Sequence, residues 1–363
     1  MLAAGNVVRE AGPVRRDETP DGAAVWVVSR YREVREALAD PRLSLDKAHS
    51  TGGYRGFSLP PALDANLLNL DPPDHTRLRR LAATAFTRTR VAALRASTER
   101  ATDALLSTMD GVNSVDLMAA LAVPLPLTVI GDLLGVPVED RARFRAWTDT
   151  LVAPDPARPE ATRAALGGML AFLTGLIAAK RAAPADDLLS GLVAARDADD
   201  RLSEDELLSL AFLLLWAGYE NSVHLIGNAV LDRLTGRTGG GAALEDLIAA
   251  ADPNPYAIRR FPLGDLRIGG VDIPAGDTVL LCIAAANGDP ARGGDPHLTF
   301  GHGSHYCLGA PLARLEAETV LGRLLARFPH LRLAVPVGEL RWRPSWRSRG
   351  LLALPVHPGP AAG

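Results

Sequence analysis

Apolar side chains recur every three or four residues along most of the chain, which is the spacing of an amphipathic helix. The pattern predicts helices over residues 31–39, 76–100, 121–134, 138–152, 161–182 and 310–328. Ser203 stands three residues before Glu206, a capping-box pattern that opens a further apolar helix running to about Leu234. Helix is therefore expected to dominate the fold.

Strand patterns are short by comparison. Residues 24–28 and 278–284 each predict a strand, and residues 266–273 predict a hairpin. Residues 235–256 carry several glycines and prolines and predict at most one short helix. Because the sequence shows neither an internal repeat nor a linker between two halves, we expect one domain over residues 1–363, mainly α with a small β region.

The composition is that of an ordinary globular protein. Of the 363 residues, 47% are hydrophobic and 22% are charged, which excludes disordered, collagen-like and coiled-coil proteins. The 39 basic and 42 acidic side chains give a net charge of −3, which disfavours a nucleic-acid partner. Since we find no secretory signal and no apolar run of about 18 residues, we expect a cytoplasmic protein without a membrane segment.

The two cysteines do not suffice for a disulfide scaffold. Cys282 lies in a predicted apolar strand and is interpreted as a core residue. Cys307 lies in a loop with three glycines, directly before a predicted helix, where a thiolate is stabilised and could bind iron. The loop lacks the further ligands of a zinc site and the Gly-Lys-Ser/Thr ending of a phosphate loop. From these residues alone, a heme-thiolate site and a simple buried cysteine both remain open.

Five positions of this loop have a spacing that resembles the heme-ligand loop of the soluble bacterial cytochromes P-450: Phe300, Gly303, His305, Cys307 and Gly309. The resemblance extends over most of the chain, from about residue 14 to residue 355. It implies the cytochrome P-450 fold and a heme b (iron protoporphyrin IX) cofactor. It also implies a monooxygenase that oxidises a medium-sized apolar small molecule, with secondary metabolism as the expected setting.

The resemblance further implies roles for individual residues. It assigns the iron ligand to Cys307, and contacts around the heme to Phe300, Gly303 and Gly309. Contacts with the heme propionates are expected from His75, Arg79, Arg260 and His305. Oxygen activation is assigned to a stretch of the long helix that contains Gly218, Glu220, Asn221 and Ser222.

Asn221 stands where the family usually has a threonine, whose hydroxyl steers protons to oxygen. An amide donates and accepts hydrogen bonds but relays protons poorly. Glu220 is expected to feed the proton network, and Gly218 to leave room for oxygen. Ser222 points about 100° further around the helix. The departure at Asn221 therefore favours slow or atypical oxidation.

A second departure lies before the cysteine. The family has a Glu-x-x-Arg pair held by a further arginine, whereas in this chain Glu245 is followed by Ile248. The only Glu-x-x-Arg found, Glu160 to Arg163, lies in the wrong region, and the loop before the cysteine is reduced to residues 289–296. With these departures, the resemblance also implies an alternative function: a heme-free or inactive P-450-like partner protein that stabilises or activates another biosynthetic enzyme, such as a glycosyltransferase.

The monooxygenase interpretation also implies electron donors. The sequence contains no flavin or iron–sulfur segment of its own. A ferredoxin and a ferredoxin reductase are therefore the expected protein partners, beside a small apolar substrate, with no nucleic acid and no membrane.

Overall fold

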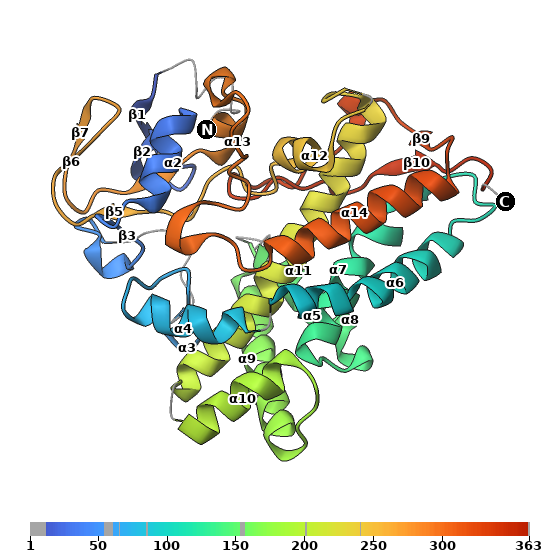
Figure 1. Ribbon diagram of the computed structural model, residues 1–363, viewed down its shortest axis with the longest axis horizontal. Coiled ribbons are helices and arrows are strands. Elements are labelled where there is room, and N and C mark those ends of the chain that lie inside the picture. The colour runs from blue at the N-terminus through green and yellow to red at the C-terminus, as the bar shows by residue number, and fades with distance from the viewer. Residues whose placement is uncertain are drawn as a thin grey trace.

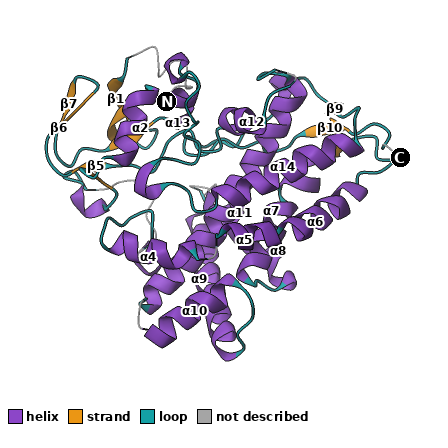
Figure 2. Cartoon of the chain, in the orientation of Figure 1, coloured by secondary structure: helices purple, strands orange, loops and turns teal. Residues whose placement is uncertain are grey.

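Figure 1 shows the computed structural model as a roughly triangular molecule, in which most short strands gather at one corner, a few lie at another corner near the C-terminus, and helices form most of the rest. The structure describes residues 12–53, 61–64, 66–84, 86–152, 157–199, 202–239 and 241–361. Figure 2 shows the same arrangement coloured by secondary structure, with few strands among many helices. The prediction of a mainly α fold with a small β region is confirmed.

The helices follow one another along the chain with short connections. Those before residue 153 are α2 (Tyr31–Ala39), α3 (Pro61–Asp64), α4 (Asp74–Ala83), α5 (Arg88–Ala93), α6 (Arg95–Ser107), α7 (Pro124–Leu134) and α8 (Val138–Val152). Those after it are α9 (Pro159–Ala182), α10 (Leu188–Asp199), α11 (Glu204–Thr235), α12 (Leu244–Ala251), α13 (Ile283–Asn287) and α14 (Ala310–Arg327). Single turns are η1 (Lys47–His49), η2 (Met118–Ala122), η3 (Pro290–Arg292), η4 (Gly303–His305) and η5 (Val337–Glu339).

The strands join segments from both ends of the chain. In one sheet, β1 (Val14–Glu18) pairs antiparallel with β2 (Ala24–Val28), which pairs in parallel with β8 (Val279–Leu281). In another, β10 (Pro355–His357) lies between β4 (Val115–Asp116) and β9 (Arg332–Leu333). The remaining pairs are β3 (Leu43–Ser44) with β5 (Phe261–Pro262), and β6 (Leu266–Ile268) with β7 (Val271–Ile273), which form the predicted hairpin.

The central element is α11. The Glu206 N–H donates to the Ser203 hydroxyl at 3.0 Å, and the Ser203 N–H donates to the Glu206 carboxylate at 2.8 Å, so the predicted capping box is present. The helix ends at Gly236, whose φ of 64° is the left-handed conformation common at helix C-termini. Between these ends it packs against α3, α7, α12 and α14 and is buried on most sides. The long apolar helix is therefore confirmed.

Two predicted elements differ from the structure. Residues 76–100 form three helices, α4, α5 and α6, instead of one. One break lies at Thr87, which has an extended backbone and accepts a hydrogen bond from the Arg90 N–H at 3.3 Å as the N-cap of α5. The predicted strand over 278–284 ends at Leu281, because Cys282 begins the short helix α13. Apolar periodicity alone does not locate such caps.

Within the described residues, α9 is long and apolar enough by composition to cross a membrane, which the sequence analysis did not identify. The pair Met118–Leu134 and Val138–Leu151, bent by 119°, would add a second span only if counted as one. In the structure α9 packs against α8, α10 and α11. A core helix of a globular protein passes the same test, so this feature does not indicate a membrane protein.

Candidate active site

The cysteine loop (residues 300–309) leads into the first turn of α14. The Cys307 N–H donates to the Phe300 carbonyl at 2.9 Å and closes the loop. Gly303 has a φ of +74°, and a Cβ placed on it would lie 2.9 Å from the Cα of Ala39. Both conditions require glycine, so Gly303 allows the loop to lie directly against the end of α2.

Cys307 is exposed, whereas Cys282 is buried as predicted. Protein atoms nevertheless surround the Cys307 thiol closely, and this desolvation raises its pKa. The N–H groups of Gly309 and Ala310 at the start of α14, and the positive charge of Arg79, act in the opposite direction and favour the thiolate. The cysteine thus has an open side and donors that stabilise its anionic form.

The fold brings together four residues predicted to contact heme propionates. We call His75, Arg79, Arg260 and His305 the cationic cluster. The ring centroids of His75, on α4, and His305, on η4, lie 3.8 Å apart. Arg79 donates to the carbonyl of Tyr306 at 2.5 Å, and Arg260 is buried just before β5. Arg79 and Arg260 both lie close enough to His305 to lower the pKa of its ring.

The cationic cluster has little negative charge to balance it within the described chain. Both ring nitrogens of His75 and Nε of Arg260 are buried there without a hydrogen-bond partner. Burial and the neighbouring cations lower the pKa of His305 to about 3, and burial lowers that of Arg260 to about 10. The acidic neighbour, Asp71, already accepts hydrogen bonds from Ser44 and from the following backbone N–H. Because buried donors without acceptors are costly, the cluster fits an added anion.

Heme fits this set of donors. Its iron binds a cysteine thiolate, and its two propionates can accept charge-assisted hydrogen bonds. Cys307 would hold the iron, and the cationic cluster would contact the propionates. A Cβ on Gly309 would lie 3.9 Å from the Cys307 sulfur, an ordinary van der Waals distance. Phe300 packs against the main hydrophobic core and anchors the start of the loop.

Gly218 and Glu220 have different neighbours on α11. A Cβ on Gly218 would lie 2.8 Å from Cδ1 of Ile130, so this glycine lets α11 and α7 pack closely. Oε1 of Glu220 lies 3.5 Å from Nε2 of His224, one turn further along the helix. Their roles toward oxygen stay predictions.

Asn221 and Ser222 also point toward separate partners. Oδ1 of Asn221 accepts a hydrogen bond from the side-chain amide of Asn254 at 2.9 Å. Ser222 is buried, and its hydroxyl hydrogen-bonds Glu316 of α14. The two neighbouring side chains therefore do not share one environment, as the turn of the helix predicts.

Glu316 is a buried acid that the sequence analysis missed. Only 1% of it is exposed, and burial raises its pKa to about 8. Leu312 and Val320, four residues away on either side, are also buried. Helical periodicity along α14 could therefore have placed Glu316 on the core side of the helix.

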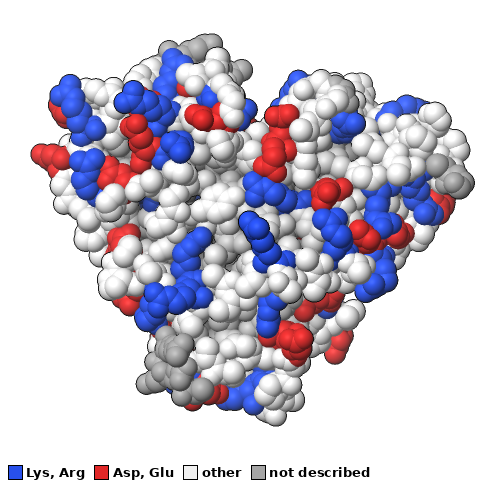
Figure 3. Space-filling view, in the orientation of Figure 1, with Lys and Arg blue, Asp and Glu red and all other residues white. Residues whose placement is uncertain are grey.

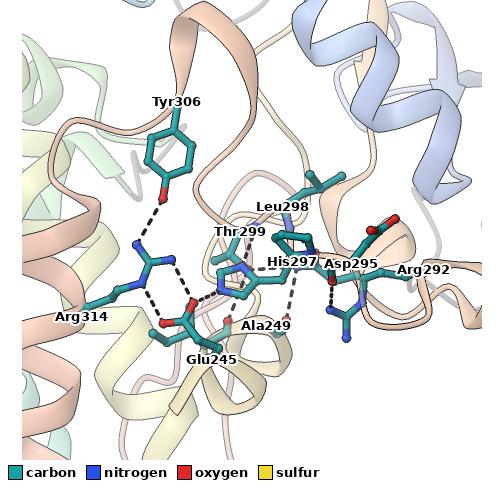
Figure 4. A network of polar contacts seen from close by, with 12 residues as sticks. Glu245, Ala249, Arg292, Asp295, His297, Leu298, Thr299, Tyr306 and Arg314 are labelled. Atoms are coloured by element: carbon teal, nitrogen blue, oxygen red, sulfur yellow. Dashed lines mark hydrogen bonds and ion pairs between the residues drawn. The ribbon is translucent and has the colours of Figure 1, made fainter. Parts of the chain in front are cut away.

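The sequence analysis also missed a polar network beside the cysteine loop, shown in Figure 4. The carboxylate of Glu245, on α12, accepts hydrogen bonds from Nε and Nη2 of Arg314, on α14, at 2.7 and 2.9 Å. Its Oε2 also lies 2.8 Å from Nε2 of His297. The sequence has Ile248 three residues after Glu245, where the family has an arginine. In the structure the arginine that pairs with Glu245 is Arg314, on another helix.

Figure 3 shows basic side chains around the centre of the face that carries α4, α5 and the start of α14. Arg80, Arg88 and Arg90 of the first two helices are exposed. A positive face of this kind attracts acidic partners by long-range electrostatics. It lies on the side of the molecule where α14 begins after the cysteine loop.

Known proteins resemble this chain over nearly its whole length. The sequence model of the cytochrome P-450 family matches residues 292–333, which include the cysteine loop. Cytochrome P-450 107B1 of Saccharopolyspora erythraea is 44% identical over 378 residues, covering 96% of this chain and 92% of the relative. The cytochrome P-450 monooxygenase PikC of Streptomyces venezuelae is 44% identical over 376 residues, covering 96% and 89%. The tirandamycin C-bound P-450 monooxygenase TamI matches in structure with a TM-score of 0.89 and 42% identity, covering 97% and 96%.

These matches cover 96% to 97% of the chain. The fold is the single-domain cytochrome P-450 fold, and the relatives are monooxygenases. The cofactor of this family is heme. The chain therefore belongs to the soluble bacterial cytochrome P-450 superfamily and is an oxidoreductase of the monooxygenase type.

Proposed function

We propose that this protein is a heme-thiolate monooxygenase that holds heme b and oxidises a medium-sized apolar small molecule in secondary metabolism. One observation carries the proposal: the exposed Cys307 lies at the start of α14, beside a cationic cluster whose buried nitrogens lack acceptors in the described chain. A heme bound through cysteine supplies the electron donation that favours cleavage of the O–O bond. The remaining chemistry depends on the residues around it.

The cationic cluster binds and orients the cofactor. His75 and Arg260 donate to the propionates from fixed, buried positions, and His305 joins them from the cysteine loop. Arg79 ties α4 to the carbonyl of Tyr306, the residue before the thiolate. The same set of side chains would therefore hold both the acidic edge of the heme and the loop that carries Cys307.

Glu220 and Asn221 handle protons and hydrogen bonds on α11. Glu220 is half-buried, and Oε1 of its carboxylate lies 3.5 Å from Nε2 of His224. The Asn221 carbonyl oxygen is engaged by Asn254, which leaves its amide N–H groups to orient a ligand or water. Because this position carries no hydroxyl, proton delivery depends on Glu220 and is slow.

The substrate class follows from the relatives and the interior. The relatives include monooxygenases of bacterial secondary metabolism, and TamI binds tirandamycin C. The first half of α11 is lined by buried apolar side chains, with Phe212, Leu213 and Leu214 among them. These features support an apolar organic substrate of moderate size.

The electron donors are a ferredoxin and its reductase. The exposed Arg80 of α4 and Arg88 and Arg90 of α5 give these two helices a positive charge that suits an acidic iron–sulfur protein. These donors are soluble proteins, which supports a cytoplasmic location.

A carbon monoxide difference spectrum of the reduced protein tests the proposal. The wild-type protein should show the red-shifted Soret band of a thiolate-bound heme, and Cys307→Ala should lose it. Cys282→Ala, which changes the buried cysteine, should keep the band. A folded wild-type protein that purifies without heme would overturn the proposal and favour the alternative, a heme-free partner that stabilises a glycosyltransferase.

A further inference from the structure

The segment before the cysteine lacks the arginine with which Glu245 would pair within its own helix. Ile248 takes that position in α12 and is fully buried. Its carbonyl accepts a hydrogen bond from the Thr299 hydroxyl at 3.4 Å, directly before the cysteine loop. The loop therefore still lies against α12, although the residue expected to hold it is apolar.

Two side chains contact the carboxylate of Glu245 in place of an arginine from its own helix: Arg314 and His297. Arg314 binds it in a bidentate arrangement, through Nε to Oε1 at 2.7 Å and Nη2 to Oε2 at 2.9 Å. His297 reaches Oε2 from the opposite end of the loop, at 2.8 Å. Bidentate pairs of arginine with carboxylate have a fixed geometry that a single contact lacks. We call Glu245, His297 and Arg314 the carboxylate clamp.

Arg314 also contacts the cysteine loop at two points, Phe300 and Tyr306. Its guanidinium carbon lies 4.6 Å from the centre of the Phe300 ring, at the start of the loop. Its Nη1 donates to the Tyr306 hydroxyl at 3.2 Å, and Tyr306 directly precedes Cys307 (Figure 4). The His297 ring lies 5.7 Å from the Phe300 ring. One guanidinium thus links α12 to the start of the loop and to the residue before Cys307.

The shortened connection places His297 within reach of the carboxylate. The Leu298 N–H donates to Oδ1 of Asn287 at 2.7 Å, and the Tyr31 hydroxyl donates to the Pro296 carbonyl at 2.8 Å. These bonds fix the residues on both sides of His297. The short loop therefore holds the His297 ring in place beside the carboxylate.

We propose that the carboxylate clamp positions the cysteine loop for heme binding, in place of the missing Glu-x-x-Arg pair. Glu245, His297 and Arg314 act as positioning residues. Arg314 contacts Phe300 and Tyr306, the His297 ring lies beside Phe300, and Glu245 acts through these two side chains. The consequence for heme rests on the proposed function. The effect on the loop itself does not require heme.

Hydrogen exchange in the as-purified protein tests the clamp without reference to activity. In Glu245→Gln and Arg314→Gln, the amides of residues 300–310 should exchange about fivefold faster or more, since charge-assisted hydrogen bonds are lost. Arg314→Lys keeps the charge but loses the fork and should give an intermediate rate. The rate increase in the double variant should be smaller than the two single effects combined, because both substitutions break the Glu245–Arg314 pair.

Arg327→Gln is the matched control. Arg327 lies on the same helix, has a similarly exposed side chain, and also makes a bidentate pair, with Asp110. It should leave exchange in residues 300–310 unchanged, and peptides of α11 should be unaffected in every variant. Equal effects of Arg314→Gln and Arg327→Gln, or no effect of Arg314→Gln, would overturn the clamp.

A second measurement connects the clamp to the heme. In the carbon monoxide complex of the reduced protein, Glu245→Gln and Arg314→Gln should convert part of the thiolate-type band to that of a neutral-thiol complex, and Arg327→Gln should not. A full thiolate band in both clamp variants contradicts positioning of Cys307. If the wild-type protein shows no heme band, the proposed function fails. Hydrogen exchange in residues 300–310 still tests whether the carboxylate clamp positions the cysteine loop.

Discussion

The rings of His75 and His305 lie with their centroids 3.8 Å apart, although one side chain comes from α4 and the other from the cysteine loop. Both ring nitrogens of His75 are buried and have no hydrogen-bond partner in the part of the chain that is described. Burial, reinforced by Arg79 and Arg260, lowers the pKa of both rings. The pair is stable only as neutral imidazoles until an anion is added, which is the environment that a propionate would complete.

Replacing His75 with phenylalanine should separate heme binding from folding. The variant removes two unsatisfied buried atoms, so the free energy of unfolding of the heme-free protein should stay equal or rise by about 1 kcal/mol. Loss of heme to excess apomyoglobin should become about tenfold faster, because a buried donor to the propionate is lost. Urea unfolding and the heme-transfer rate measure the two effects. A large loss of stability in the heme-free variant would show that His75 is a core residue and not a cofactor contact.

Gly303→Ala and Gly301→Ala compare two glycines of the same loop. Both have positive φ, +74° and +75°, but a Cβ on Gly301 would have its nearest contact at 3.7 Å, whereas one on Gly303 would approach Ala39 Cα to 2.9 Å. Gly301→Ala should lower the free energy of unfolding by about 1 kcal/mol, from backbone strain alone. Gly303→Ala should lower it by about 3 kcal/mol, because the clash adds to that strain. Equal losses in urea unfolding would contradict a close contact between the loop and α2.

Local sequence signals located most of the fold. The capping box of Ser203 and Glu206 marked the start of α11 because its hydrogen bonds join residues three positions apart. The cysteine loop could be recognised because its glycines and cysteine must follow one another closely. The break at Thr87 was missed, since the apolar positions on either side continue the same period.

Contacts between segments far apart in the chain could not be predicted from the sequence. Glu245 and Arg314 are 69 residues apart, and nothing near either one indicates that they meet. Ile248 leaves Glu245 without an arginine in its own helix. Only the folded chain shows that Glu245 pairs with Arg314 of α14. The four residues of the cationic cluster were found through resemblance, but their lack of acceptors became visible only once the fold had placed them together.

Glu316→Gln should change how stability depends on pH. The folded-state pKa of Glu316 is raised to about 8 by burial, well above the unfolded value of about 4.3. The folded chain therefore keeps a proton that the unfolded chain releases, and the contribution of this group to stability falls as pH rises from about 4.3 to about 8. The neutral glutamine should make the variant more stable than wild type by about 4–5 kcal/mol at pH 8, with little difference near pH 4.

Urea unfolding across this pH range measures the difference, with Glu318→Gln as the control. Glu318 lies two residues away, is exposed, and pairs with Arg95 on the surface. Its replacement should leave the pH profile parallel to that of wild type, since exposed ion pairs contribute little. A Glu316→Gln profile that is also parallel would show that the buried carboxyl does not titrate in this range.

Asn221→Thr should raise the share of electrons that reach product. The substitution supplies a hydroxyl that relays protons, so the product formed per reducing equivalent consumed should increase by about two- to tenfold. It also removes the acceptor of the 2.9 Å bond from Asn254, which should lower the free energy of unfolding by about 1 kcal/mol. Asn254→Ala breaks the same bond without adding a hydroxyl, so it should show the stability loss and no gain in coupling. If both variants couple electrons to product as poorly as wild type, Asn221 does not limit proton delivery.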